Sequence, residues 1–167
     1  MARREDLGTW LEGTPEDPEA RAELGVAPDG PGSLARLPRR LAALAIDWAL
    51  CLAVSGLIAP VPGQGRGILA GAPLVTMAVF GVSSTVLVGL LGTTVGHRLL
   101  GLRVVRARDL AGPADGAAAR VAAAPPPGIL AGLVRSALLC LVIPAVVWDR
   151  DGRGLHDTAA GTVLVRG

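Results

Sequence analysis

Residues 68–91 form a stretch of twenty-four residues without a charged side chain. About 20 apolar residues in a helix cross the roughly 30 Å hydrocarbon core of a bilayer. The whole chain is 51% hydrophobic and 18% charged, whereas soluble domains carry about 25% charged residues. We therefore predict a transmembrane helix over residues 68–91, with lipid as its solvent.

Two further apolar stretches accompany it. Residues 41–59 carry one charge, Asp47, and as a helix would extend about 28 Å. The Pro- and Gly-rich residues 60–67 would join the two helices as an antiparallel hairpin. Residues 128–148 form a third apolar run, interrupted by Arg135 and Pro144. This run either crosses the membrane or dips into it and returns, and the sequence leaves both open.

The remaining residues are predicted to lie outside the lipid. Residues 102–106 and 162–165 read as short strands, and residues 107–127 as a linker. Residues 1–33 hold eight acids and three arginines, a net charge of −5, and are expected to be disordered. The predicted fold class is an all-α membrane protein: a bundle of about three transmembrane helices, two short extra-membrane strands and a disordered N-terminal tail. The membrane domain spans residues 34–167.

The arginines predict the orientation, because positive residues stay on the cytoplasmic side. Three arginines precede the first helix and four follow the second, whereas the turn between them has only Arg66. We expect a multi-pass protein of the cell inner (plasma) membrane with a cytoplasmic N-terminus. The expected partners are the lipid bilayer and its anionic headgroups rather than nucleic acid.

Asp47 is the residue that most needs a partner, because a bare carboxylate at the centre of a membrane helix costs about 2.5–3.5 kcal/mol. Arg40 lies two helical turns earlier, and Arg135 would lie at nearly the same depth if residues 128–148 also enter from the cytoplasm. Protonation is a third way to remove the charge. We hypothesise an Asp47–Arg135 ion pair. It would either hold helices in register or belong to a proton or cation relay.

Small residues recur at four-residue spacing, which lets membrane helices approach closely. The three sets are Ala45, Ala49 and Ala53; Gly81, Thr85 and Gly89; and Gly128, Gly132 and Ser136. We expect these faces to pack within one chain or between copies of a homo-oligomer.

The sequence predicts no catalytic residues, metal site or cofactor. Cys51 and Cys140 are too few and too far apart for a disulfide framework or a metal site. His156 and Asp157 lack the further ligands that a metal phosphohydrolase site needs. An enzyme is therefore the least favoured class.

Three segments in order resemble the RDD family of bacterial membrane proteins, which is named for one Arg and two Asp. They are RLAALAID at residues 40–47, GHRLLGLRVV at residues 96–105 and GLHDTAAGTVLV at residues 154–165. The resemblance assigns the signature to Arg40, Asp47 and Asp157. It adds the auxiliary positions Gly96, His97, Arg98, Gly101, Arg103 and His156.

The resemblance implies a multi-helix membrane protein, and transport has been suspected for the family. Family members usually have Lys at the position of His97, which here could titrate near neutral pH. We expect a small transporter, or transport-associated subunit, for protons, cations or small solutes, with Asp47 on the path. The alternative is a non-enzymatic membrane adaptor or assembly factor. It would recruit a cytoplasmic protein through residues 1–33, where Leu7, Trp10 and Leu11 have the spacing of one face of a short helix. A frayed turn without a role is the slightly favoured reading of this short segment.

Overall fold

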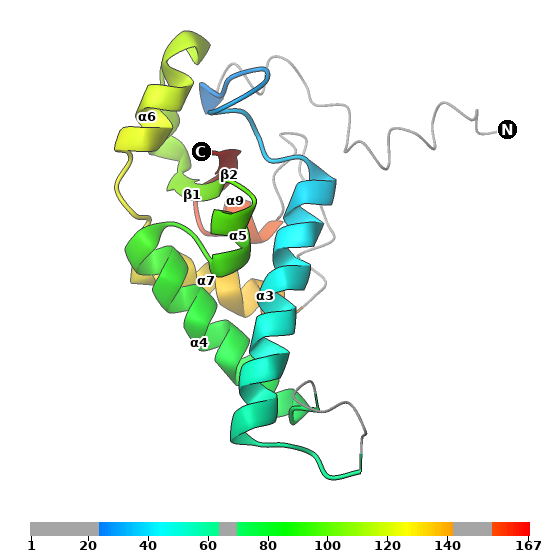
Figure 1. Cartoon of the computed structure of the whole chain (residues 1–167). Coiled ribbons are helices and arrows are strands. Elements are labelled where there is room, and N and C mark those ends of the chain that lie inside the picture. The colour runs from blue at the N-terminus through cyan, green and yellow to red at the C-terminus, as the bar shows by residue number, and fades with distance from the viewer. Residues whose placement is uncertain (1–23, 64–69, 142–154) are drawn as a thin grey trace, which may run out of the picture.

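The computed structural model describes residues 24–63, 70–141 and 155–167, and Figure 1 shows their arrangement. Two long helices form the body, one shorter helix packs along them, and most of the remaining elements lie at one end. The elements in chain order are α3 (Leu37–Ile58), α4 (Pro73–Leu91), α5 (Val95–Leu99), β1 (Leu102–Arg106), the 3-10 helices η2 (Ala107–Leu110) and η3 (Ala114–Gly116), α6 (Ala117–Ala123), α7 (Ile129–Cys140), α9 (Leu155–Ala159) and β2 (Thr162–Arg166).

Helices α3 and α4 are the two described helices long and apolar enough to cross a membrane, with mean hydropathies of 2.1 and 2.2. Proline lies in the first turn of each, where its missing N–H costs no hydrogen bond. Helix α4 ends at Gly92, whose φ of 70° suits glycine. Both predicted helices are confirmed, but α3 begins four residues earlier than predicted and α4 begins five residues later.

The two helices have an apolar outside and a more polar inside. The exposed side chains include Leu57 at 73% and Leu74 at 82% exposure. The side chains buried between helices include Ser55, Thr76 and Ser84. A soluble helix has the opposite pattern, whereas lipid solvates apolar side chains and leaves polar ones to pair inside.

A two-stranded antiparallel sheet lies at the end of this helix pair (Figure 1). Its register pairs Leu102 with Arg166 and Arg106 with Thr162. The segment before α3 joins the sheet, since the Ala35 amide donates to the Leu164 carbonyl at 3.0 Å. Both predicted strands are confirmed. Three segments therefore meet at one end of the long helices: the start of α3, the segment after α4, and β2.

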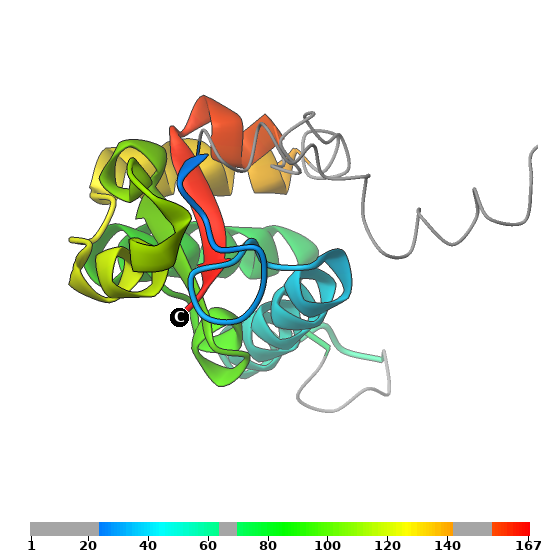
Figure 2. The same ribbon diagram turned by 90° about the horizontal axis from the view of Figure 1, so that it is seen from above.

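The sheet contributes residues to a small hydrophobic core. Figure 2, seen from above, shows α6 beside the sheet. The core consists of Val26, Leu34, Val105, Leu110, Val121, Ala124, Val163 and Val165. Two predictions are corrected here. Residues 107–127 form short helices rather than a linker, because Val121 completes the core. The disorder predicted over residues 1–33 is wrong for residues 24–33, because Val26 is buried in the core and the Gly32 amide donates to the Arg166 carbonyl, whereas residues 1–23 lie outside the described residues.

The third apolar run, predicted over residues 128–148, forms only the twelve-residue helix α7 within the described residues. It packs along α4 through small residues. A Cβ on Gly132 would lie 2.6 Å from the Thr85 carbonyl oxygen, and one on Gly89 would lie 2.8 Å from Ile129 Cα. Two of the predicted small-residue faces thus meet within one chain. Residues 142–148 lie outside the described residues, and a third spanning helix is not confirmed.

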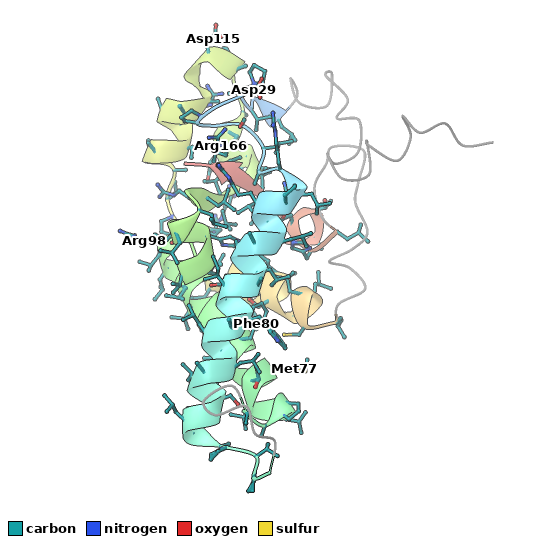
Figure 3. All side chains as sticks on the ribbon, turned by 45° about the vertical axis from the view of Figure 1, so that its right-hand side comes forward. Asp29, Met77, Phe80, Arg98, Asp115 and Arg166 are labelled. Atoms are coloured by element: carbon teal, nitrogen blue, oxygen red, sulfur yellow. The ribbon has the colours of Figure 1, made fainter. Side chains whose placement is uncertain are left out.

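The third small-residue face, on α3, does not pack inside the chain. Ala45 and Ala49 are both exposed, so this face lies toward the surrounding solvent or lipid. Figure 3 shows the charged side chains Asp29, Asp115 and Arg166 at the sheet end and Met77 far along the helices.

Candidate functional site

Asp47 anchors the short helix α5 to α3. Its Oδ2 accepts a hydrogen bond from the Thr94 hydroxyl at 2.5 Å, and its Oδ1 accepts one from the Gly96 amide at 2.7 Å. Both donors lie at the N-terminus of α5, where backbone N–H groups have no partner within the helix. The carboxylate is therefore satisfied by hydrogen bonds from the segment that follows α4.

Glycine is required at position 96 by the closeness of this contact. A Cβ there would lie 2.2 Å from the Ala43 carbonyl oxygen and 2.9 Å from Oδ2 of Asp47. Any side chain would push α5 away from α3. This explains physically why the motif GHRLLG begins with glycine.

The other two signature residues meet at a second, fully buried centre. Arg135 of α7 forms an ion pair with Oδ1 of Asp157 in α9, and Arg40 Nη1 lies 3.7 Å from Asp157 Oδ2. Arg40 also donates from Nε to the Ala35 carbonyl at 2.6 Å. One carboxylate thus joins α3, α7 and α9. Removing a partner from such a buried pair typically costs about 3–5 kcal/mol.

Two neighbours complete the surroundings of Asp157. The Thr162 hydroxyl at the start of β2 donates to its Oδ1 at 3.2 Å, and His156 Nε2 lies 3.5 Å from its Oδ2. Asp157 is 0% exposed. The closing motif therefore places the carboxylate between α9 and the sheet, facing both arginines.

His97 is a neutral capping residue. Its Nδ1 accepts a hydrogen bond from the Thr94 amide at 3.3 Å, while the Thr94 hydroxyl accepts from the His97 amide. The pKa of His97 is lowered to about 3, mainly by burial and in addition by the positive charges of Arg135 and Arg40. The expectation that His97 titrates near neutral pH is therefore wrong.

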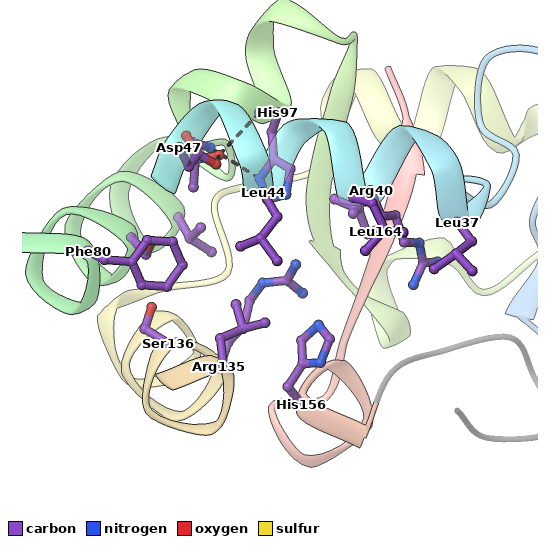
Figure 4. Close-up of a pocket in the computed structure, with 15 residues that line it drawn as sticks. Leu37, Arg40, Leu44, Asp47, Phe80, His97, Arg135, Ser136, His156 and Leu164 are labelled. Carbon is purple, nitrogen blue, oxygen red and sulfur yellow. Dashed lines mark hydrogen bonds between the residues drawn. The ribbon is translucent and has the colours of Figure 1, made fainter. Parts of the chain in front are cut away.

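The two centres line one cavity of about 70 Å³ between α3, α4, α5, α7 and α9. Its charged and polar lining comes from Arg40, Asp47, Ser84, Thr94, His97, Arg135, Ser136 and His156. Its remaining walls are apolar and include Leu44 and Phe80. Figure 4 shows the Arg135 side chain reaching between Leu44 and His156, while the Asp47 carboxylate turns toward α5.

The predicted Asp47–Arg135 ion pair is not formed. Both residues line the cavity, which agrees with the prediction that they lie at nearly the same depth in the membrane. Each has another partner, however: Asp47 binds the start of α5, and Arg135 binds Asp157. The sequence reasoning failed because a threonine hydroxyl and a backbone amide, both far along the chain, satisfy Asp47, and a backbone amide carries no sequence signal.

The auxiliary positions lie outside the cavity, apart from His97 and His156. Arg98 is exposed, and Gly101 makes a turn with a φ of 62°. Arg103 donates to the carbonyls of Ala122 and Ala124, tying β1 to α6. These residues shape the sheet end rather than the site.

Three polar residues of the cavity were not predicted as site residues: Thr94, Ser84 and Ser136. A Thr three residues before a polar side chain is a capping-box signal and could have identified Thr94. The two serines carried no such signal. No group of three or more His, Cys, Asp or Glu that could hold a metal ion occurs within the described parts of the chain.

Comparison with known proteins agrees with the three motifs. The model of the family described as "RDD family" matches residues 34–161, which is most of the chain. No curated protein and no solved structure matches the chain.

Proposed function

Because the chain belongs to the RDD family and has a partly open, mostly apolar cavity lined by several ionisable side chains, we propose that it transports a small solute or ion across the membrane. The observation that best supports this proposal is the cavity and its ionisable lining. Ionisable side chains are costly within membrane helices and are usually retained there for function. Arg40, Asp47 and Arg135 all line one small space.

The cavity size limits the solute. A space of about 70 Å³ holds a few waters or one small ion, since one water needs about 10–15 Å³ of such space. Pockets for drug-sized molecules measure roughly 300–1,000 Å³. The proposed cargo is therefore an ion or a solute of a few atoms.

The proposed orientation places the sheet end in the cytoplasm. Arg36, Arg103 and Arg166 belong to this end, and arginines favour the cytoplasmic side. Both ends of the described chain would then be cytoplasmic. The proposed transporting unit is an oligomer, because two spanning helices enclose little space, and the exposed small-residue face of α3 offers a contact between copies.

The test is flux through the purified protein in liposomes, measured for protons, alkali cations and small anions in turn. Ser136→Val should abolish flux, because the larger side chain fills part of the cavity without changing its charge. Ala137→Val is the matched control, since Ala137 is the next residue of α7 and is exposed. It should transport at the wild-type rate.

Absence of flux for every solute would overturn the proposal, as would equal flux through the two variants. In that case the adaptor alternative would gain support. It predicts that deleting residues 1–23, which precede the packed segment beginning at Leu24, ends function in cells.

A further inference from the structure

We propose that the junction of α4, β1 and α7, around Gly92 and Gly128, binds the headgroup of one anionic phospholipid, with Arg103 and Arg106 holding its phosphate. The inference does not depend on the transport proposal. It follows from three features of this junction: two arginines without a carboxylate partner, a net positive charge around them, and exposed apolar side chains directly beside them.

Both guanidinium groups lie where α4 ends and α7 begins. A Cβ on Gly92, the residue that caps α4, would lie 3.7 Å from Arg103 Nε. A Cβ on Gly128 would lie 3.0 Å from a terminal nitrogen of Arg106. The Gly128 amide donates to the Gly89 carbonyl at 3.1 Å, which holds the start of α7 against the last turns of α4. Figure 1 shows the chain passing from α6 to the start of α7 beside this end of α4.

The two arginines keep charge and donors available for a ligand. Arg106 donates from Nε to the Pro127 carbonyl at 2.8 Å, and its terminal nitrogens have no hydrogen-bond partner among the described residues. Arg103 donates from its terminal nitrogens to the carbonyls of Ala122 and Ala124. Carbonyls are uncharged, and the described residues form no ion pair with either arginine. Two positive charges therefore stay uncompensated, and guanidinium groups bind phosphate through paired N–H donors.

The surroundings favour an anionic lipid over a zwitterionic one. Outside the two buried centres, the described residues hold eight arginines and three aspartates, a net charge of +5. The buried centres contribute no net charge, because they hold two arginines and two aspartates. A zwitterionic headgroup would bring an ammonium group into this positive field, whereas a headgroup such as phosphatidylglycerol has no positive charge.

Apolar side chains continue from the junction along α7. The start of α7 lies beside the last turns of α4, and its other end, at Cys140, lies near Gly81. Leu130 and Leu133, one turn apart near the start of α7, are 75% and 52% exposed. The junction therefore lies between side chains that face acyl chains and a basic end that faces water. This is the position of a phospholipid phosphate rather than of a soluble anion.

The test measures thermal unfolding of the purified full chain in detergent, with one addition at a time. Phosphatidylglycerol is the anionic lipid, phosphatidylcholine with the same acyl chains is the zwitterionic lipid, and glycerol phosphate is the soluble anion. We expect phosphatidylglycerol, at ten times its dissociation constant, to raise the midpoint by about 3–6 °C more than phosphatidylcholine does. Glycerol phosphate should leave the midpoint unchanged.

Variants then assign the effect to the junction. The double variant Arg103→Gln, Arg106→Gln should lose most of the difference between the two lipids, because glutamine can still donate to a carbonyl but carries no charge. The matched control is the double variant Arg39→Gln, Arg120→Gln, which removes the same charge and should keep the difference. Arg39 is exposed, and Arg120 binds three backbone carbonyls outside the junction. Should the junction variant fail to fold, Arg106→Gln alone, which keeps both carbonyl bonds of Arg103, should lose at least half of the difference.

Three results would overturn the inference: equal stabilisation by the two lipids, equal stabilisation by glycerol phosphate and phosphatidylglycerol, or an equal loss in the junction variant and its control. The third result would indicate diffuse attraction by the basic end instead of a binding site. The liposome assay tests transport separately, because it compares Ser136→Val with Ala137→Val in one lipid mixture. Either proposal can therefore fail while the other stands.

Discussion

Replacing Gly96 with alanine tests whether the contact between α3 and α5 holds the membrane part to the sheet end. The new Cβ would lie 2.2 Å from the Ala43 carbonyl oxygen, so α5 must move outward. That movement breaks the 2.7 Å bond from the Gly96 amide to Asp47. A hydrogen bond to a charged group contributes about 1.5–3 kcal/mol, and overpacking costs about 1–3 kcal/mol. Because relaxation relieves part of the clash, we expect a loss of about 3 kcal/mol.

The assay is the thermal unfolding midpoint in detergent. For a chain of this length, a loss of about 3 kcal/mol lowers the midpoint by about 6–12 °C. The matched control is Gly81→Ala in α4, where a Cβ would lie 3.8 Å from Cys140 Sγ, at ordinary contact distance. Alanine is the better helix former, so this control should be neutral or slightly stabilising. If Gly96→Ala unfolds within 2 °C of the control, the proposed role of the Asp47 anchor is refuted.

Three further predictions concern packing, pH and topology. Gly132→Ala should destabilise by about 1–3 kcal/mol, because its Cβ meets the Thr85 carbonyl oxygen at 2.6 Å; a thermal midpoint equal to that of Gly81→Ala would contradict it. His97 binds its proton more weakly when folded, with a pKa of about 3 against an ordinary 6.5. Its contribution should therefore reduce stability by about 1.4 kcal/mol per pH unit as pH falls from about 6.5 toward 3. His97→Gln should flatten the pH dependence of the midpoint, and an unchanged acid slope would exclude His97 as its source. A cysteine at Gly167, in a chain whose native cysteines are replaced, should react with an impermeant thiol reagent only from the cytoplasmic face; labelling from outside would reverse the orientation.

Several features followed directly from the sequence. The lengths of the uncharged stretches predicted α3 and α4, because the thickness of a bilayer fixes how many apolar residues a crossing needs. Short runs rich in Val and Leu predicted both β1 and β2. The single carboxylate in an apolar helix identified Asp47 as a residue that must have a partner. The signature Arg40, Asp47 and Asp157 came from a family resemblance that the match over residues 34–161 supports.

Other features depended on how the chain folds back. The partners of Asp47 lie 47 and 49 residues away, and one of them is a backbone amide, a group present in almost every residue. The ion pair between Arg135 and Asp157 forms only because α9 lies next to α7 at the sheet end. The sequence left open whether residues 128–148 cross the membrane, so it did not predict this position of α9. A sequence shows which charges need neutralising in lipid. Only the tertiary structure determines which groups neutralise them, because pairing depends on distances between helices that no local pattern encodes.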